Sequence, residues 1–330
     1  FLASPPRPLN LRGITVGIPR ALSNWEYLYL WRRLFNKLGC NVVISRNSSG
    51  ELIKAGVEAV GSETCFPVKV AHGHIIDLSK RNLDFIFLPS IVSGIDKAPD
   101  GSRNYFCPYI QAFPYIIKSS LSDRMNNIRI VSPIIRFGEG IEAVVKTLQH
   151  DLKELGFGAK EIESAYRDSL NEFEDFKKQL IEIGSDYYKN ITPEKPGLLL
   201  IGRPYNSIDP GVSLDLASKL TDQGITVISM DMVQLPEDEF KFIYWQRGRR
   251  ILKAAKLAKD TPGLFPIYIS NFGCGPDSFL IHHFKKIMGD KPHLILELDE
   301  HSADAGLITR CEAFLDSLPR HDKKYYSTIS

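Results

Sequence analysis

Short runs of aliphatic and β-branched residues alternate along this chain with longer amphipathic stretches of helical period. In the first half, strand-like runs occupy residues 14–18, 41–45, 83–88 and 128–132, and helical stretches occupy 25–38, 68–80 and 109–119. The second half repeats the alternation, with strands expected at 197–201, 225–229, 264–270 and 293–298 and helices at 212–223, 240–259, 277–288 and 303–318. Such alternation predicts βαβ units, whose crossover helices allow neighbouring strands to run parallel. The predicted fold class is α/β, with mainly parallel sheets in two halves.

A long charged segment of helical period separates the two halves. Residues 139–188 contain few glycines or prolines after Gly158, and we expect two helices there. The predicted organisation is an N-terminal α/β lobe over 1–150, a helical linker over 151–195 and a C-terminal α/β lobe over 196–330.

Composition and charge limit the binding partners and the cellular location that we expect. The 330 residues are 43% hydrophobic and 24% charged with a net charge of +2, which argues against nucleic-acid and anionic-membrane partners. No apolar run reaches the roughly 18 residues that span a bilayer, and the first residues lack the apolar core of a signal peptide. Five sparsely spaced cysteines, an odd number, disfavour a disulfide framework. We therefore expect a cytoplasmic protein in a reducing environment.

Three cysteines share one local setting. Cys65, Cys107 and Cys274 each have a proline one or two residues later, an aromatic residue within two positions, and a helical stretch directly following. A thiol at a helix N-terminus is favoured as thiolate by the helix dipole. Cys40 and Cys311 lack this setting and are expected to be packing residues.

Three soft ligands without short-spaced histidines suit an iron–sulfur cluster better than zinc, which usually shows a paired Cys-x2-4-Cys. Their spacing matches no local cluster motif, so three buried structural thiols remain the alternative. Arg203 and Arg20 follow strands at the edge where such sheets bind ligands, and each is a candidate for holding an anion or cluster sulfur. For both, a salt bridge that holds the turn is an equal alternative. The turns after these strands are not Gly-x-Gly-x-x-Gly fingerprints, which argues against nicotinamide binding.

Several motifs across residues 13–318 resemble one known family. They are GIPRAL at 17–22, ETCFP at 63–67, NYFCP at 104–108, IGRPYN at 201–206, NFGCGPDSF at 271–279 and ELDEHSADAG at 297–306. This set resembles the acyl-CoA dehydratase activase-related (CoA-substrate-specific enzyme activase-related) family, within the 2-hydroxyacyl-CoA dehydratase subunit and double-cubane-cluster superfamily.

The resemblance implies Rossmann-like or flavodoxin-like lobes with an iron–sulfur cluster, a [4Fe-4S] cluster or a double cubane, held by Cys65, Cys107 and Cys274. It also implies a partner, an ATP-hydrolysing activator of the acetate/sugar kinase/actin-like fold, assembly as a homodimer or heterodimer, and a CoA thioester or other small-molecule substrate. The sequence itself carries no phosphate-binding ATPase motif.

The sequence leaves three candidate functions. The first is an iron–sulfur protein like the dehydratase subunits, which receives low-potential electrons from the activator for reductive or radical dehydration. Whether it would be a lyase, a reductase component or an electron relay is left open. The second is a non-catalytic scaffold or regulatory subunit that docks an activase. The third is a two-lobe periplasmic-type or sugar-binding protein, which the cysteine settings disfavour.

Overall fold

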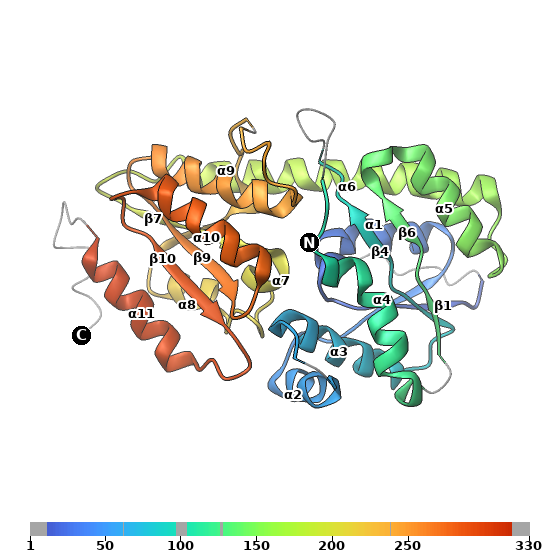
Figure 1. Ribbon diagram of the computed structural model, residues 1–330. Helices are drawn as coiled ribbons and strands as arrows, with labels where there is room; N and C mark the ends of the chain where they lie inside the picture. Colours follow the sequence, from blue (N-terminus) through green and yellow to red (C-terminus); the bar gives the residue numbers. More distant parts are fainter. Residues whose placement is uncertain (1–11, 62, 97–103, 126–127, 238, 319–330) are drawn as a thin grey trace. The chain divides into compact units, whose positions relative to one another are not determined.

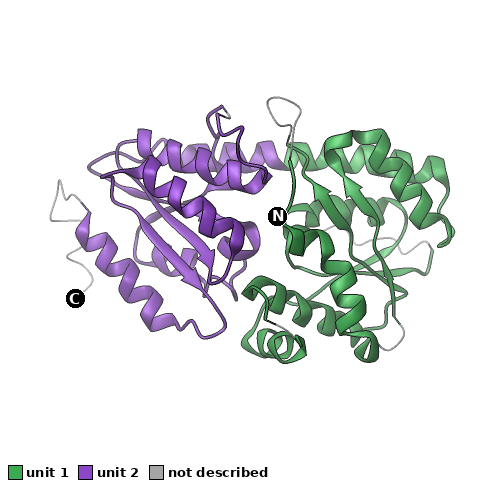
Figure 2. Cartoon of the chain, in the orientation of Figure 1, with its two compact units in different colours: residues 1–176 green, residues 177–330 purple. Residues whose placement is uncertain are grey.

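The computed structural model describes residues 12–318 apart from 62, 97–103, 126–127 and 238 (Figure 1). The chain divides into two compact units, residues 1–176 and residues 177–330 (Figure 2). Each unit is built on a four-stranded parallel sheet. The predicted α/β class with mainly parallel sheets is therefore confirmed.

The sheet of unit 1 has the strand order β2-β1-β3-β5. Its strands are β1 (Thr15–Ile18), β2 (Asn41–Ile44), β3 (Phe85–Phe87) and β5 (Arg129–Val131), and a separate parallel pair is formed by β4 (Ser90–Ser93) and β6 (Ile134–Arg136). The helices are α1 (Ser23–Lys37), α2 (Gly50–Ala59), α3 (Phe66–Ser79), α4 (Pro108–Ser120), α5 (Ile141–Lys153) and α6 (Ala159–Tyr188). Aromatic side chains of α1 form much of the core: Trp31 and Phe35 both contact Phe87 on β3.

The sheet of unit 2 has the order β10-β9-β7-β8. Its strands are β7 (Gly197–Gly202), β8 (Thr226–Ser229), β9 (Leu264–Asn271) and β10 (Leu294–Leu298), and its helices are α7 (Pro204–Ser207), α8 (Leu216–Asp222), α9 (Gln246–Asp260), α10 (Gly275–Met288) and α11 (Asp304–Ser317). Alternate residues of β7 join two cores: Leu199 packs with α9 and α10, and Leu200 with α8 and α11. Helices therefore cover both faces of this sheet (Figure 1).

In both sheets the strand order reverses beside the first strand of the unit. In unit 1 the first strand, β1, lies between β2 and β3, and in unit 2 the first strand, β7, lies between β8 and β9. In open α/β sheets the carboxyl ends of the strands beside such a reversal form the usual ligand crevice. Arg203 follows β7 directly and Arg20 follows β1 after one proline, so both lie at the expected edge of their own sheets.

The structure departs from the expected elements at a few positions. The helix predicted over 212–223 begins only at Leu216, because Leu214 and Asp215 adopt a left-handed φ of 53° and Asp209 Oδ1 accepts hydrogen bonds from the N–H groups of Gly211 and Val212. The helix predicted over 240–259 likewise begins at Gln246, and α2, β4 and β6 were not predicted. The two helices expected between the halves are α5 and α6, and the boundary between the units falls inside α6. The lobe boundaries at 150 and 195 stay a prediction.

Candidate functional site: three helix N-terminal cysteines

Each of the three singled-out cysteines is the N-cap residue of a long helix. Cys65 precedes α3, Cys107 precedes α4 and Cys274 precedes α10, and all three have extended backbone angles, with φ from −66° to −75°. A proline occupies the first or second helical position in every case, where its missing N–H is no loss. Two segments of unit 1 and one of unit 2 therefore repeat a single local design.

The three sulfurs share the environment of a helix N-terminus. The first N–H groups of a helix lack intrahelical acceptors, and the helix dipole places partial positive charge there. All three side chains are partly exposed, so solutes can reach them. Cys40 and Cys311, by contrast, are fully buried, and burial raises their pKa to about 12 and about 11. They remain neutral thiols that pack the core.

Serine at the three N-caps should preserve stability. Serine is among the best N-cap residues because its hydroxyl accepts a hydrogen bond from the first turn. We expect Cys65→Ser, Cys107→Ser and Cys274→Ser to match or exceed the wild-type free energy of unfolding in urea. Cys40→Ala, which leaves a small void in the core, should lose about 1 kcal/mol. A loss of that size in the serine variants would show that these sulfurs are packing groups.

Beside Cys274, unit 2 contains a buried ion pair. Arg203 Nη1 donates to Asp277 Oδ1, and the two side chains are only 5% and 1% exposed. The same carboxylate accepts hydrogen bonds from Tyr268 Oη at 2.9 Å and Ser270 Oγ at 2.6 Å. Asp277 is the third residue of α10, so the pair ties the turn after β7 to the end of β9 and to the helix that Cys274 begins.

The charge of Arg203 is fixed by this setting. Burial acts to lower the pKa of Arg203, but the negative charges of Asp277 and Cys274 outweigh it and hold that pKa well above its ordinary value. The interaction is reciprocal, so the guanidinium stabilises a thiolate at Cys274. Of the two roles predicted for Arg203, the structural salt bridge is present, and a role toward a ligand stays a prediction.

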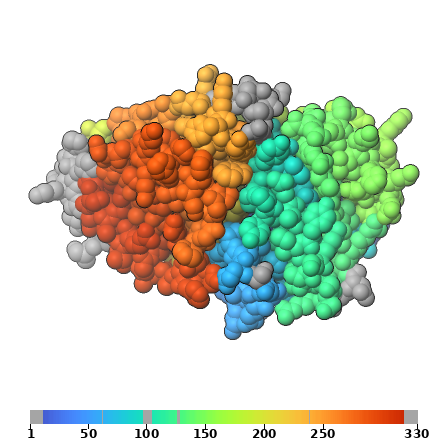
Figure 3. Space-filling model, viewed as in Figure 1, coloured from blue at the N-terminus to red at the C-terminus, as the bar shows by residue number. Residues whose placement is uncertain are grey.

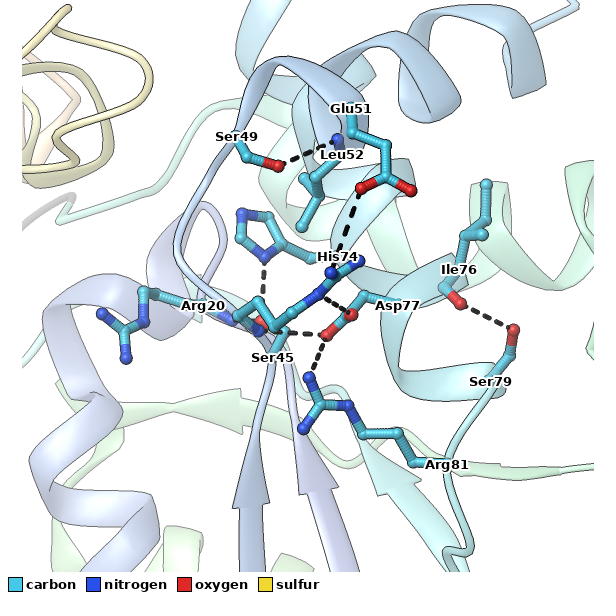
Figure 4. A network of polar contacts seen from close by, with 11 residues as sticks. Arg20, Ser45, Ser49, Glu51, Leu52, His74, Ile76, Asp77, Ser79 and Arg81 are labelled. Carbon is cyan, nitrogen blue, oxygen red and sulfur yellow. Dashed lines mark hydrogen bonds and ion pairs between the residues drawn. The ribbon is translucent and has the colours of Figure 1, made fainter.

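In unit 1, Arg20 lies near a buried histidine, His74. Its Nη1 donates to Asn47 Oδ1 at 2.5 Å, and its guanidinium lies 5.4 Å from the centre of the Trp25 ring. Its backbone N–H donates to Ser45 Oγ, which also bonds His74 Nδ1 at 2.8 Å (Figure 4). Ser48 Oγ holds the other ring nitrogen of His74 at 3.0 Å. Arg20 is thus engaged by its own unit, and its predicted ligand role stays a prediction.

His74 is expected to make stability depend on pH. Burial and then the Arg20 charge lower its pKa from the ordinary 6.5 to about 3. Between those pH values the unfolded chain binds a proton that the folded chain does not. The free energy of unfolding therefore decreases as the pH is lowered, by up to about 1.4 kcal/mol per pH unit. Urea unfolding should show a steeper loss below pH 6.5 in the wild type than in His74→Gln. An NMR titration in which the His74 ring protonates near 6.5 would contradict this.

A neighbouring carboxylate, Asp77, joins α3 to the loop after β2. It accepts from Arg46 Nε at 2.7 Å and Arg81 Nη2 at 2.8 Å (Figure 4). Burial acts to raise the pKa of Asp77, but the hydrogen bonds from Arg46 and the charges of Arg81 and Arg46 hold it below its ordinary value. The contact with Arg46 could not be predicted from the sequence, because Arg46 and Asp77 are 31 residues apart.

The three cysteines are distributed over both units. Cys65 and Cys107 belong to unit 1 and Cys274 to unit 2, so neither unit contains the set alone. Within the part of the chain that the structure describes, no group of three or more His, Cys, Asp or Glu side chains is placed to hold a metal ion. The predicted shared iron–sulfur cluster therefore gains no support from the arrangement of side chains, and it stays a prediction.

A family model assigns the chain. The model described as "CoA enzyme activase uncharacterised domain" matches residues 15–233, which is more than half of the sequence and includes Cys65, Cys107 and Arg203. The chain belongs to this family. The activase part of the predicted resemblance is thereby confirmed.

The family also corrects the first functional prediction. We expected an iron–sulfur subunit of the dehydratase type, which accepts electrons from an activator. The description of the family names a CoA enzyme activase and not a dehydratase subunit, so the prediction of a dehydratase-like subunit is wrong. The cysteine motifs indicate the local chemistry of the thiols. They do not distinguish an activase from the enzyme that it activates.

Similarity to solved structures is faint. The SBP FpvC of Pseudomonas aeruginosa in complex with Ni2+ is 12% identical, with 92% of this chain and 94% of that chain covered and a TM-score of 0.26. A ZnuA structure is 11% identical, with 93% and 99% covered and a TM-score of 0.27. The laminin-binding protein of Streptococcus agalactiae is 12% identical, with 92% and 99% covered and a TM-score of 0.23. Similarity this low supports no inference about this chain.

No curated protein matches this member of the CoA enzyme activase family. Among the described residues, no helix combines the length and the apolar character needed to cross a membrane.

Proposed function

We propose that this chain is an activase-family domain that serves a CoA-dependent enzyme, and that Cys65, Cys107 and Cys274 are the thiolates through which it works. The observation that carries the proposal is the threefold repetition of a partly exposed cysteine at the N-cap of a helix with an early proline. A thiol needed only for packing would not require this design, and the two packing thiols of the same chain lack it.

The donor set fits a soft metal group. Thiolates are the ligands of iron–sulfur clusters, and N–H groups at a helix N-terminus stabilise the negative charge of ligated sulfur. We propose that the three cysteines hold a [4Fe-4S] cluster, which supplies one-electron chemistry when bound. The chain's own contribution would be to place each sulfur at a helix N-terminus, with the Arg203 charge acting on Cys274. Arg20, in unit 1, stays a candidate for binding an anion within its own unit.

The proposal includes binding partners and a cellular location. Its partners would be a CoA-dependent enzyme and an ATP-hydrolysing activator, in a reducing cytoplasm where thiolates persist. The wider 2-hydroxyacyl-CoA dehydratase superfamily enters only as the class of enzyme served, and not as the activity of this chain.

Anaerobic reconstitution tests the proposal. Purified protein is incubated with ferrous iron and sulfide, desalted, and assayed for bound iron and acid-labile sulfide. We expect each of Cys65→Ser, Cys107→Ser and Cys274→Ser to lose most of the iron that the wild type retains. Cys40→Ala and Cys311→Ala are the matched controls and should retain it. A wild type that binds no iron, or serine variants that bind as much as the wild type, would refute the proposed ligands.

A further inference from the structure

An exposed group of aromatic rings lies on unit 2, outside every interaction described so far. It consists of Phe242, Trp245, Phe279 and His283, which we call the aromatic surface. The His283 ring lies 5.0 Å from the Phe242 ring and 4.9 Å from the Phe279 ring, and Phe279 lies 6.2 Å from Trp245. The four rings therefore form one continuous patch rather than isolated side chains.

Two rigid elements present this patch. Phe279 and His283 are one turn apart on α10, and Phe242 and Trp245 come from the segment that leads into α9. Trp245 also packs against the buried core beneath α9 and α10, which anchors the patch to the sheet. Orange atoms, which belong to the part of the chain around residues 240–290, are visible on the face shown in the space-filling view (Figure 3).

The exposure of these rings is costly without a partner. Phe242 is 53% exposed and Phe279 is 47% exposed, although both are large apolar side chains. Contiguous exposed apolar side chains on a soluble protein mark interaction sites, and Phe, Trp and Tyr are enriched in the buried centres of protein interfaces. The patch has the composition of an interface centre.

Cations flank the rings. Lys286 lies on the same face of α10 as Phe279 and His283, and its charge helps to lower the pKa of His283, after burial and the His282 charge. Lys241 directly precedes Phe242 and is exposed. The carboxylate of Glu239 is paired with Lys256 at 3.3 Å, and that of Asp277 is buried against Arg203. The edge of the aromatic surface is therefore basic.

We propose that the aromatic surface docks an acidic protein segment that carries an aromatic or aliphatic anchor residue. The anchor packs among Phe242, Trp245 and Phe279, and its flanking carboxylates pair with Lys241 and Lys286. An acidic rim on the partner complements the basic rim here, and the rings require an apolar group that a simple polyanion does not supply.

The inference builds on the proposed function, since it assigns the surface through which unit 2 meets its enzyme. Phe279 is five residues beyond Cys274 on one helix, or about 7.5 Å along the axis at 1.5 Å per residue. A partner seated on the aromatic surface would therefore contact the helix that begins at a proposed working thiol. Its test uses no iron, so it can fail while the cluster proposal stands, and the reverse also holds.

Selection from random peptides displayed on phage provides the test. The full-length protein is immobilised, and the Phe242→Ala/Phe279→Ala double variant is the counter-target. We expect a consensus with several Asp or Glu residues around one large apolar residue, enriched on the wild type alone. The synthetic consensus peptide should bind at least about tenfold more weakly to Phe279→Ala. Lys286→Glu should weaken binding and reduce its salt dependence.

The matched control is Tyr115→Ala, which removes an aromatic side chain that is 50% exposed in unit 1 and should leave the affinity unchanged. Circular dichroism confirms that the variants are folded. The proposal is overturned if no consensus emerges, if the consensus is not acidic, or if the double variant selects it equally well. Sedimentation of the wild type as a dimer that Phe279→Ala dissociates would overturn it in favour of a second copy of the chain.

Discussion

Replacing Asp277 by Asn is expected to lower the free energy of unfolding of unit 2 by about 3–5 kcal/mol. The substitution removes the charge that compensates Arg203, whose side chain is 5% exposed and cannot recover its hydration. It also weakens the acceptor of the Tyr268 and Ser270 hydroxyls. The loss should be visible as an earlier urea transition, followed by circular dichroism.

Asp304→Asn is the matched control. Asp304 is also in the first turn of a helix of unit 2 and pairs with Lys219 at 2.7 Å, but it is 62% exposed. An exposed pair contributes about 0–1 kcal/mol, so this variant should remain close to the wild type. Adding Arg203→Gln to Asp277→Asn should recover part of the loss, because no unpaired charge then stays buried. Equal losses in Asp277→Asn and Asp304→Asn would show that the Arg203 pair contributes no more than a surface pair.

Gly56→Ala is expected to separate two helices of unit 1. A Cβ atom at Gly56 on α2 would lie 2.1 Å from the backbone oxygen of Lys69 on α3, and one at Gly73 on α3 would lie 2.2 Å from that of Leu52. Backbone atoms on both sides leave no flexible side chain to yield. We expect a loss of about 1–3 kcal/mol in the free energy of unfolding, despite the better helix propensity of alanine.

Gly50→Ala is the control on the same helix. A Cβ atom at Gly50 meets nothing within 4 Å, so this variant should be neutral or slightly stabilising. Urea unfolding of both variants distinguishes contact from propensity. Gly56→Ala as stable as Gly50→Ala would contradict the close approach of α2 and α3.

Local signals in the sequence predicted the parts of the structure that depend on local physics. Periodicity located the strands of both sheets, because burial on one or both faces sets the pattern of apolar residues. Proline one or two residues after a cysteine is found at the beginnings of α4 and α10, since proline fits the first turn of a helix. The short α2 was missed because its place in the fold depends on a glycine contact with α3, which no periodic pattern reports.

The polar networks could not be predicted, because they join distant segments. Arg203 and Asp277 are separated by 74 residues, and neither the strand nor the helix alone indicates that the other is present. The two-residue spacing of His72 and His74 points them in different directions on a helix, so the sequence indicates no shared metal site and no other role for either. In the structure His72 is also buried, where Nδ1 contacts the Val68 carbonyl and Nε2 contacts Ser120 Oγ. Both histidines stabilise the fold of unit 1.

We propose that Cys65, Cys107 and Cys274 act together on one bound group, while Cys40 and Cys311 only pack. Alkylation with iodoacetamide, read at each cysteine by mass spectrometry, tests it directly when metal-free and iron–sulfide-reconstituted protein are compared under anaerobic conditions. We expect Cys65, Cys107 and Cys274 to react in the metal-free protein and to become protected together after reconstitution, while Cys40 and Cys311 react only after unfolding. Reactivity of the three that is unchanged by reconstitution, or native reactivity of Cys40 or Cys311 equal to theirs, would contradict the claim.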